Sequence, residues 1–118
     1  MKNSEIKGAV NAAWSASAIS LFKLDIIVQD FSAVDVYPKT PDGELCGVSW
    51  RILPDDGVIV RYADNLKTGG SEIIEEMNFK DADDIERIFT DEFKSLDETL
   101  QLSLENGGPE MGVTTRGG

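Results

Sequence analysis

The chain has no histidine and a single cysteine, Cys46, among its 118 residues. Histidine is the commonest general base and metal ligand in proteins, and a structural zinc site needs several Cys or His ligands. Their absence excludes a histidine-dependent nucleophilic triad and a Cys/His zinc site within one chain. One cysteine also excludes an intramolecular disulfide, so nothing indicates an oxidising compartment.

Long apolar runs are missing as well. The opening segment MKNSEIKGAVNAAW has no continuous apolar stretch after its lysines, unlike a secretory signal, and no run approaches the roughly 20 residues that span a bilayer. We therefore expect a cytoplasmic protein. The apolar fraction of 41%, with aromatic residues spread along the chain, is high enough for a folded domain with a modest core.

Basic residues are scarce, with 11 Lys and Arg against 22 Asp and Glu, and the net charge is −11. Residues 1–70 hold seven basic and nine acidic side chains, whereas residues 71–118 hold four and thirteen. The negative field of the C-terminal half repels nucleic acid and anionic membranes and attracts basic partners. The alternative is that this charge only keeps the protein soluble.

The clearest structural pattern is a β-hairpin. Two apolar runs, residues 45–53 and 58–62, flank the turn sequence Pro54-Asp55-Asp56-Gly57. Proline presets φ for the turn, and glycine accepts a positive φ. Alternation along the first strand predicts that Cys46, Val48, Trp50 and Ile52 face the core. We expect Arg51 and Arg61 near one another outside, either as two solvated arginines or as a paired site for a carboxylate or phosphate.

An amphipathic helix is predicted over residues 4–20, with Ser4 as its N-cap. Residues 21–37 fit two patterns, because an apolar stripe continues the helix to Phe31 while apolar and polar residues also alternate as in a strand. The β-branched residues 26–28 tilt the balance slightly toward a strand.

Two further segments are predicted to be extended. Residues 34–37 precede Pro38, which disfavours a helix before it. Residues 73–79 alternate in polarity and fit a third strand of the meander, with a helix as the competing interpretation.

Residues 80–105 predict a long acidic helix. Asp81 or Asp83 can cap its start, and Asn106-Gly107-Gly108 supplies a stop. Its apolar stripe consists of Ile85, Phe89, Phe93, Leu96, Leu100 and Leu104. We expect this stripe to pack against the sheet.

The opposite face of this helix carries an acidic row that repeats every seven residues: Asp84, Asp91, Glu98 and Glu105. Lys80, Arg87 and Lys94 lie three or four residues away, so intrahelical ion pairs are predicted for most of the row. With nine acids and three bases, the helix carries one net charge per roughly 6.5 Å, against about 1.7 Å for duplex DNA. It is too dilute to mimic DNA unless Glu72, Glu76 and a symmetry mate lie beside it.

Carboxylates are the only candidate metal ligands. Asp55-Asp56 and residues 81–84 supply oxygens that suit Mg²⁺ or Ca²⁺, but neither has the spacing of a calcium-binding loop. Turn and cap roles are favoured, and we predict no metal and no cofactor. The last residues, Arg116-Gly117-Gly118, resemble the end of ubiquitin-like and sulfur-carrier proteins, in which the terminal glycine is activated as an acyl adenylate. The order of elements departs from that family, whose chains open with a hairpin.

The predicted fold class is α+β: an N-terminal helix and a long acidic C-terminal helix pack on an antiparallel meander of three or four strands. One domain is expected over residues 1–106, followed by a flexible glycine-rich tail at residues 107–118. A rich supply of glycine makes this tail poor at packing.

The predicted function is protein binding without catalysis. The sharper hypothesis is an inhibitor or nucleic-acid mimic that blocks a basic, nucleic-acid-binding partner, as phage-encoded anti-defence (anti-CRISPR-like) and toxin immunity proteins do. The alternative is a homodimeric secretion-type chaperone that binds an apolar segment of its partner, and an enzyme comes third. The expected partner-binding residues are Glu72, Glu76, Asp84, Asp91, Glu98 and Glu105.

Overall fold

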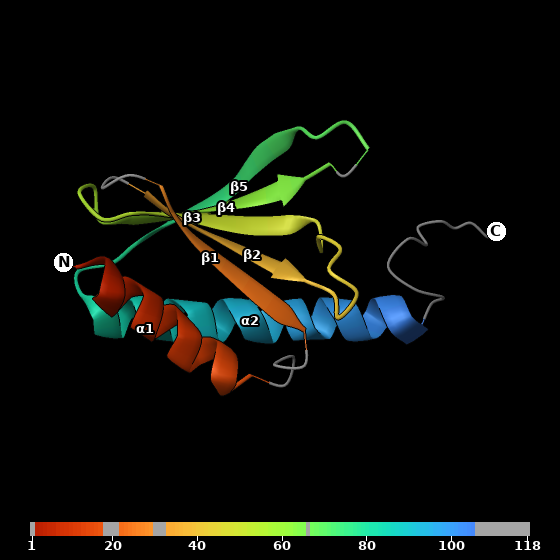
Figure 1. The fold of residues 1–118 in the computed structure, drawn as a ribbon, viewed down its shortest axis with the longest axis horizontal. Helices are drawn as coiled ribbons and strands as arrows, with labels where there is room; N and C mark the ends of the chain where they lie inside the picture. The colour runs from red at the N-terminus through yellow and green to blue at the C-terminus, as the bar shows by residue number, and fades with distance from the viewer. Residues whose placement is uncertain (1, 18–21, 30–32, 66, 106–118) are drawn as a thin grey trace.

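The computed structural model describes residues 2–17, 22–29, 33–65 and 67–105 (Figure 1). In chain order its elements are α1 (Asn3–Ser15), β1 (Lys23–Gln29), β2 (Ala33–Lys39), β3 (Val48–Leu53), β4 (Val58–Asp64), β5 (Ser71–Asn78) and α2 (Ala82–Glu105). The strands form one antiparallel sheet in the order β1-β2-β3-β4-β5. The α+β class and the meander are confirmed. The predicted tail, residues 107–118, lies outside the described residues.

The sheet has five strands, against the three or four that we predicted, and residues 23–29 form β1. Their backbone pairs with β2 over seven positions, from Lys23 opposite Lys39 to Gln29 opposite Ala33. The helical interpretation of this segment is therefore wrong over residues 23–29. The extended conformation predicted for residues 34–37 is confirmed as part of β2.

Helix α1 is shorter than predicted and begins earlier. Its N-cap is Lys2, and Ser4 lies inside the first turn, so the predicted cap is wrong. The Lys2 backbone N–H donates to Glu5 Oε1 at 2.9 Å, so a side chain of the first turn binds back to the N-cap residue. The helix ends at Ser15, and residues 18–20 of the predicted helix lie outside the described part of the chain.

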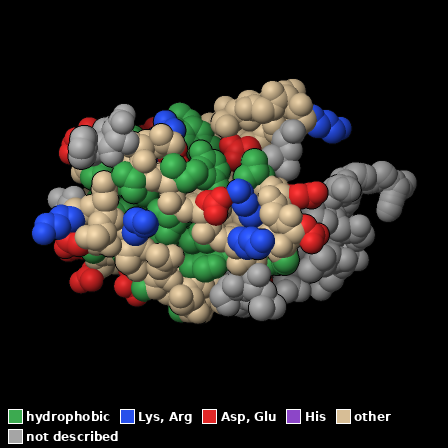
Figure 2. Space-filling model, in the orientation of Figure 1, with side chains coloured by type: hydrophobic (Ala, Val, Ile, Leu, Met, Phe, Trp, Pro, Cys, Tyr) green, Lys and Arg blue, Asp and Glu red, His purple; other side chains and the backbone are tan. Residues whose placement is uncertain are grey.

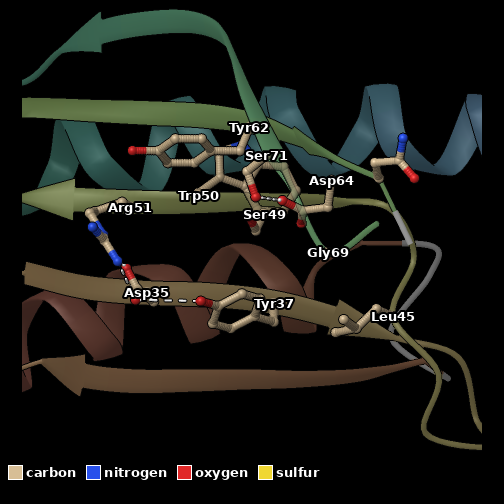
Figure 3. Close-up of a pocket in the computed structure, with 11 residues that line it drawn as sticks. Asp35, Tyr37, Leu45, Ser49, Trp50, Arg51, Tyr62, Asp64, Gly69 and Ser71 are labelled. Atoms are coloured by element: carbon tan, nitrogen blue, oxygen red, sulfur yellow. Dashed lines mark hydrogen bonds and ion pairs between the residues drawn. The ribbon is translucent and has the colours of Figure 1, made fainter. Parts of the chain in front are cut away.

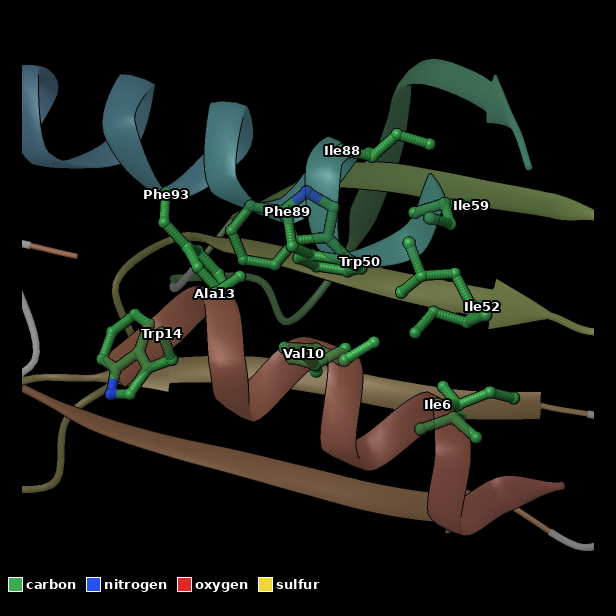
Figure 4. Close-up of a cluster of buried hydrophobic side chains, with 14 of the residues drawn as sticks. Ile6, Val10, Ala13, Trp14, Trp50, Ile52, Ile59, Ile88, Phe89 and Phe93 are labelled. Carbon is green, nitrogen blue, oxygen red and sulfur yellow. The ribbon is translucent and has the colours of Figure 1, made fainter. Parts of the chain in front are cut away.

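Both helices pack side by side against one face of the sheet, and the core lies between the helices and the sheet (Figures 1 and 4). Trp50 and Ile52 of β3 point into this layer, as their alternation predicted. Phe93 of α2 lies at its centre. Its ring contacts those of Trp14, Trp50 and Phe89, with centroids 4.9, 5.5 and 5.3 Å away. The described part of the chain places no helix over the opposite, open face of the sheet (Figure 1).

The β3–β4 hairpin is confirmed, but its register separates the two arginines. The four-residue turn pairs Leu53 with Val58, so Arg51 lies opposite Val60 and Arg61 lies opposite Trp50. Directly opposite residues share a face of the sheet. Arg61 therefore points toward the helices, whereas Arg51 lies on the open face. The expected proximity of the two arginines is wrong.

Gly57 closes this hairpin turn with φ +64°, and an added Cβ would lie 3.0 Å from the carbonyl oxygen of Phe79. Gly57→Ala is expected to lower the free energy of unfolding by about 2 kcal/mol, because alanine is strained in the left-handed region and crowds that oxygen. In the matched control, Gly43→Ala, φ is +93° but no atom lies within 4 Å of the added Cβ. Its expected loss is about 1 kcal/mol. Urea denaturation compares the two; equal losses would contradict the role of crowding.

No helix in the described ranges is both long enough and apolar enough to cross a bilayer.

Candidate functional site

The acidic row runs along the face of α2 that points away from the sheet. Its opposite stripe is buried at Ile85, Phe89, Phe93 and Leu96. Asp91 and Glu98 are exposed, and Asp84 is half-buried. Glu105 is the last residue of α2, and its side chain lies outside what the structure describes. A single helix face therefore brings Asp84, Asp91 and Glu98 into one line.

The Asp84 side chain forms hydrogen bonds at the N-terminus of α2. Its carboxylate accepts from the Lys80 backbone N–H at 2.9 Å and from Arg87 Nη2 at 3.1 Å. The bond from Lys80, followed by that from Arg87, lowers the pKa of Asp84 below its ordinary value. The Asp84 N–H in turn donates to Asp81 Oδ1 at 3.0 Å, so Asp81 caps the helix as predicted.

The expected intrahelical pairing is largely wrong. Within the described residues, the row forms one ion pair, Asp84 with Arg87. The side-chain ammonium groups of Lys80 and Lys94 form no ion pair with the row there. Asp91 and Glu98 also have no ion pair in the same residues. A surface depression of about 320 Å³ runs beside Asp91 along this face. The outer face of α2 therefore presents more uncompensated negative charge than its sequence suggested.

The two predicted acids of β5 lie on different faces of the sheet. Glu72 is opposite Ala63. Ala63 lies two residues after Arg61 in β4, so Arg61, Ala63 and Glu72 all lie on the helix side of the sheet. Glu76 is opposite Val60, which shares the open face with Arg51. Both side chains are exposed. The structure thus places Glu72 on the same side of the sheet as α2, and Glu76 on the other side.

Glu92, which was not among the predicted site residues, joins α2 to the sheet. Its side chain is buried, and its Oε1 accepts from Trp50 Nε1 at 2.8 Å. Arg61 Nη1 donates to both oxygens of Glu92, at 2.9 and 3.0 Å. Arg61 Nη2 also binds the exposed Glu75 at 2.9 Å. One buried carboxylate therefore satisfies the indole N–H and the guanidinium, and it fixes how α2 sits on the sheet.

A hollow of about 450 Å³ lies on the open face of the sheet (Figure 3). At one end, Arg51 binds Asp35 through two bonds, Nε to Oδ1 at 2.7 Å and Nη2 to Oδ2 at 3.0 Å. Asp35 is only 2% exposed although no helix covers this face. Gln29 Nε2 and Tyr37 Oη also donate to Asp35 Oδ2, at 3.2 and 3.5 Å. At the other end, the Asp64 carboxylate accepts from Ser71 Oγ at 2.7 Å.

The electrostatics of this hollow follow from the Asp35–Arg51 pair. Burial and the neighbouring negative charge of Asp35 raise the pKa of Tyr37, so its hydroxyl keeps its proton. The hydrogen bond to Asp35 raises the pKa of Arg51. The sequence did not predict this site. Its one local signal was a carboxylate, Asp35, inside the otherwise apolar strand AVDVY.

Within the described residues, no three carboxylate or thiol groups converge in a way that would hold a metal ion. Asp55 and Asp56 are exposed in the hairpin turn, and Asp81 is occupied as a helix cap. Cys46 is half-buried, and burial raises the pKa of its thiol. Asp55 and Asp56 therefore lie in a turn, and Asp81 serves as a helix cap.

The fold and its surfaces define a small α+β protein with two helices on one side of a meander sheet, an acidic outer helix face and a polar hollow on the open sheet face. Comparison of the chain with protein-family models, curated proteins and solved structures finds no match.

Proposed function

We propose that this protein is a non-catalytic binding module that docks the acidic row of α2 on a basic, nucleic-acid-binding partner and blocks that partner's groove. The observation that supports this most directly is the state of Asp91 and Glu98. Both are exposed, and neither has an ion pair within the described residues. A partner can therefore bind these two charges without breaking an ion pair among the described residues.

The spacing of the row suits a surface that binds phosphates. Seven residues of α-helix advance about 10.5 Å, which is close to about three steps of 3.4 Å along one DNA strand. The row therefore offers roughly every third charge of a nucleic-acid strand. That density is enough for electrostatic steering and register, although it falls well below that of a complete phosphate backbone.

The helix that carries these charges is held rigidly. Ile85, Phe89, Phe93 and Leu96 of its apolar stripe are buried, and Glu92 binds Trp50 and Arg61 of the sheet. A rigid presentation reduces the conformational entropy that is lost on binding. The acidic row is therefore preorganised for a complementary basic groove.

The test reverses two row charges. Asp91→Lys/Glu98→Lys is expected to weaken binding to the basic protein that the wild type captures from its native host by about 100-fold, because attraction becomes repulsion. The matched control, Asp55→Lys/Asp56→Lys, changes the net charge equally in the exposed hairpin turn. Titration calorimetry at low and high salt measures both variants.

Unchanged affinity of the row variant would reject the proposal. An equal loss in both variants would show that only the total charge matters, and it would reject the row as a specific surface. Weaker binding of the wild type at high salt is expected, because exposed charges are screened.

A second candidate, the homodimeric secretion-type chaperone, is favoured by apolar exposure at the sheet edges. Ile73 and Ile74 of β5 are 58% and 51% exposed, and Ile27 and Val28 of β1 are also exposed. Figure 2 shows hydrophobic side chains at the surface among charged ones on the face drawn. An unpaired edge strand can bind an extended segment by strand addition. This function requires a stable dimer and binding of an apolar peptide that does not depend on salt. Binding through the acidic row, in contrast, should weaken at high salt.

A further inference from the structure

We propose that the hollow on the open face of the sheet is a second binding site, which takes an arginine side chain of another protein. The hollow and the acidic row lie on opposite sides of the sheet. The two sites can therefore be tested independently, and the failure of one leaves the other intact.

The walls of the hollow suit a flat cation. Tyr37 stands on β2 and Tyr62 on β4, the two strands that flank β3 (Figure 3). Strands lie about 4.8 Å apart, so the two tyrosines rise from backbones separated by roughly 10 Å. Between them β3 contributes the small, buried Ser49. This spacing leaves room for a planar group between two aromatic walls, and guanidinium stacks on aromatic faces more readily than ammonium does.

The charges of the hollow select a cation over an anion. Asp35 and Arg51 neutralise each other through two hydrogen bonds. Asp64 is then the one charged group lining the hollow that has no ion pair within the described residues. Its Oδ1 accepts from Ser71, whereas its Oδ2 has no hydrogen-bond partner in the same residues. A guanidinium at this end would gain a charge-assisted bond, while a carboxylate or phosphate would meet Asp64 as a like charge.

The probe is the peptide acetyl-Gly-Gly-Arg-Gly-Gly-amide, and the readout is the amide NMR spectrum of the ¹⁵N-labelled protein. We expect saturable shifts at Tyr37, Ser49, Tyr62 and Asp64. The citrulline peptide has the same shape without the charge, and it should bind at least tenfold more weakly. Comparable or tighter binding of the citrulline peptide or of a glutamate peptide would overturn the proposal.

Variants place the interaction in the hollow. Asp64→Asn keeps an oxygen for Ser71 but removes the charge, so the arginine peptide should bind at least tenfold more weakly. Tyr62→Leu should also weaken binding, whereas Tyr62→Phe, which keeps the ring, should retain most of it. Asp91→Asn/Glu98→Gln alters only the acidic row and should leave the peptide affinity unchanged.

Equal binding by Asp64→Asn and the wild type would overturn the proposal, provided that the amide spectrum away from the hollow is unchanged. Arg116 of the same chain is a competing occupant. If the peptide binds only to the Arg116→Gln chain, the C-terminal segment of this protein fills the hollow, and the proposal of a partner's arginine is overturned.

Discussion

Replacing Phe93 with alanine is expected to lower the free energy of unfolding by about 4 kcal/mol. Phe93 is fully buried, and its ring contacts those of Trp14, Trp50 and Phe89. Truncation removes the transfer free energy of the ring and leaves a cavity, and it also loses two edge-to-face contacts with the tryptophans. Because α1, β3 and α2 all meet at this ring, the cavity cannot close by the movement of one element.

The loss is large relative to the total stability of a domain, which is typically about 5–15 kcal/mol. It should appear as a fall in Tm of about 15 °C. Tryptophan fluorescence during urea denaturation measures it directly, since both tryptophans touch Phe93. Phe93→Leu keeps most of the volume and should cost clearly less. Phe22→Ala, at a half-buried site, is the matched truncation. A loss at Phe93 no greater than that at Phe22 would contradict its central position.

Segments whose signals are local were predictable from sequence. The hairpin turn at residues 54–57 is encoded by its own residues, and α2 by a stripe that repeats over many turns. Residues 23–29 were ambiguous because their local pattern fits both structures. Pairing with β2 decides the matter, and that contact is tertiary. The same limit applies to Arg61, whose face depends on the register that the turn imposes on β4.

The site residues divide in the same way. Asp84, Asp91 and Glu98 share a helix face, and helical periodicity alone predicts that. Glu92 was missed although a signal existed, because it lies four residues after Ile88 and four before Leu96, inside the buried stripe. The open-face hollow combines residues of β2, β3, β4 and β5 with residues of the β2–β3 and β4–β5 loops. No window of sequence contains it, so only the paired sheet reveals it.

The buried network around Glu92 supports the second large prediction. Glu92→Ala is expected to lower the free energy of unfolding by about 3 kcal/mol, because it leaves the Trp50 indole N–H without a partner and Arg61 without its inner carboxylate. The Glu92 side chain is 10% exposed and that of Arg61 26%. Partial access of water to Arg61 keeps the expected loss at the lower end of the range for broken buried pairs. Glu75→Gln, at the exposed partner of Arg61, should cost less than about 0.5 kcal/mol.

A double-mutant cycle separates the ion pair from the other contacts of Glu92. Arg61→Met leaves the buried Glu92 carboxylate without its cation, and Glu92→Leu leaves Arg61 with only the exposed Glu75. The double variant removes both members of the buried pair and fills the same space with apolar atoms. The double variant should therefore lose less stability than the sum of the single variants, by about 2 kcal/mol. Additive losses, measured by urea denaturation, would contradict a direct coupling between Arg61 and Glu92. The indole N–H of Trp50 remains unpaired in the double variant, so full recovery is not expected: the Glu92 carboxylate of α2 binds two groups of the sheet, the Trp50 indole and the Arg61 guanidinium.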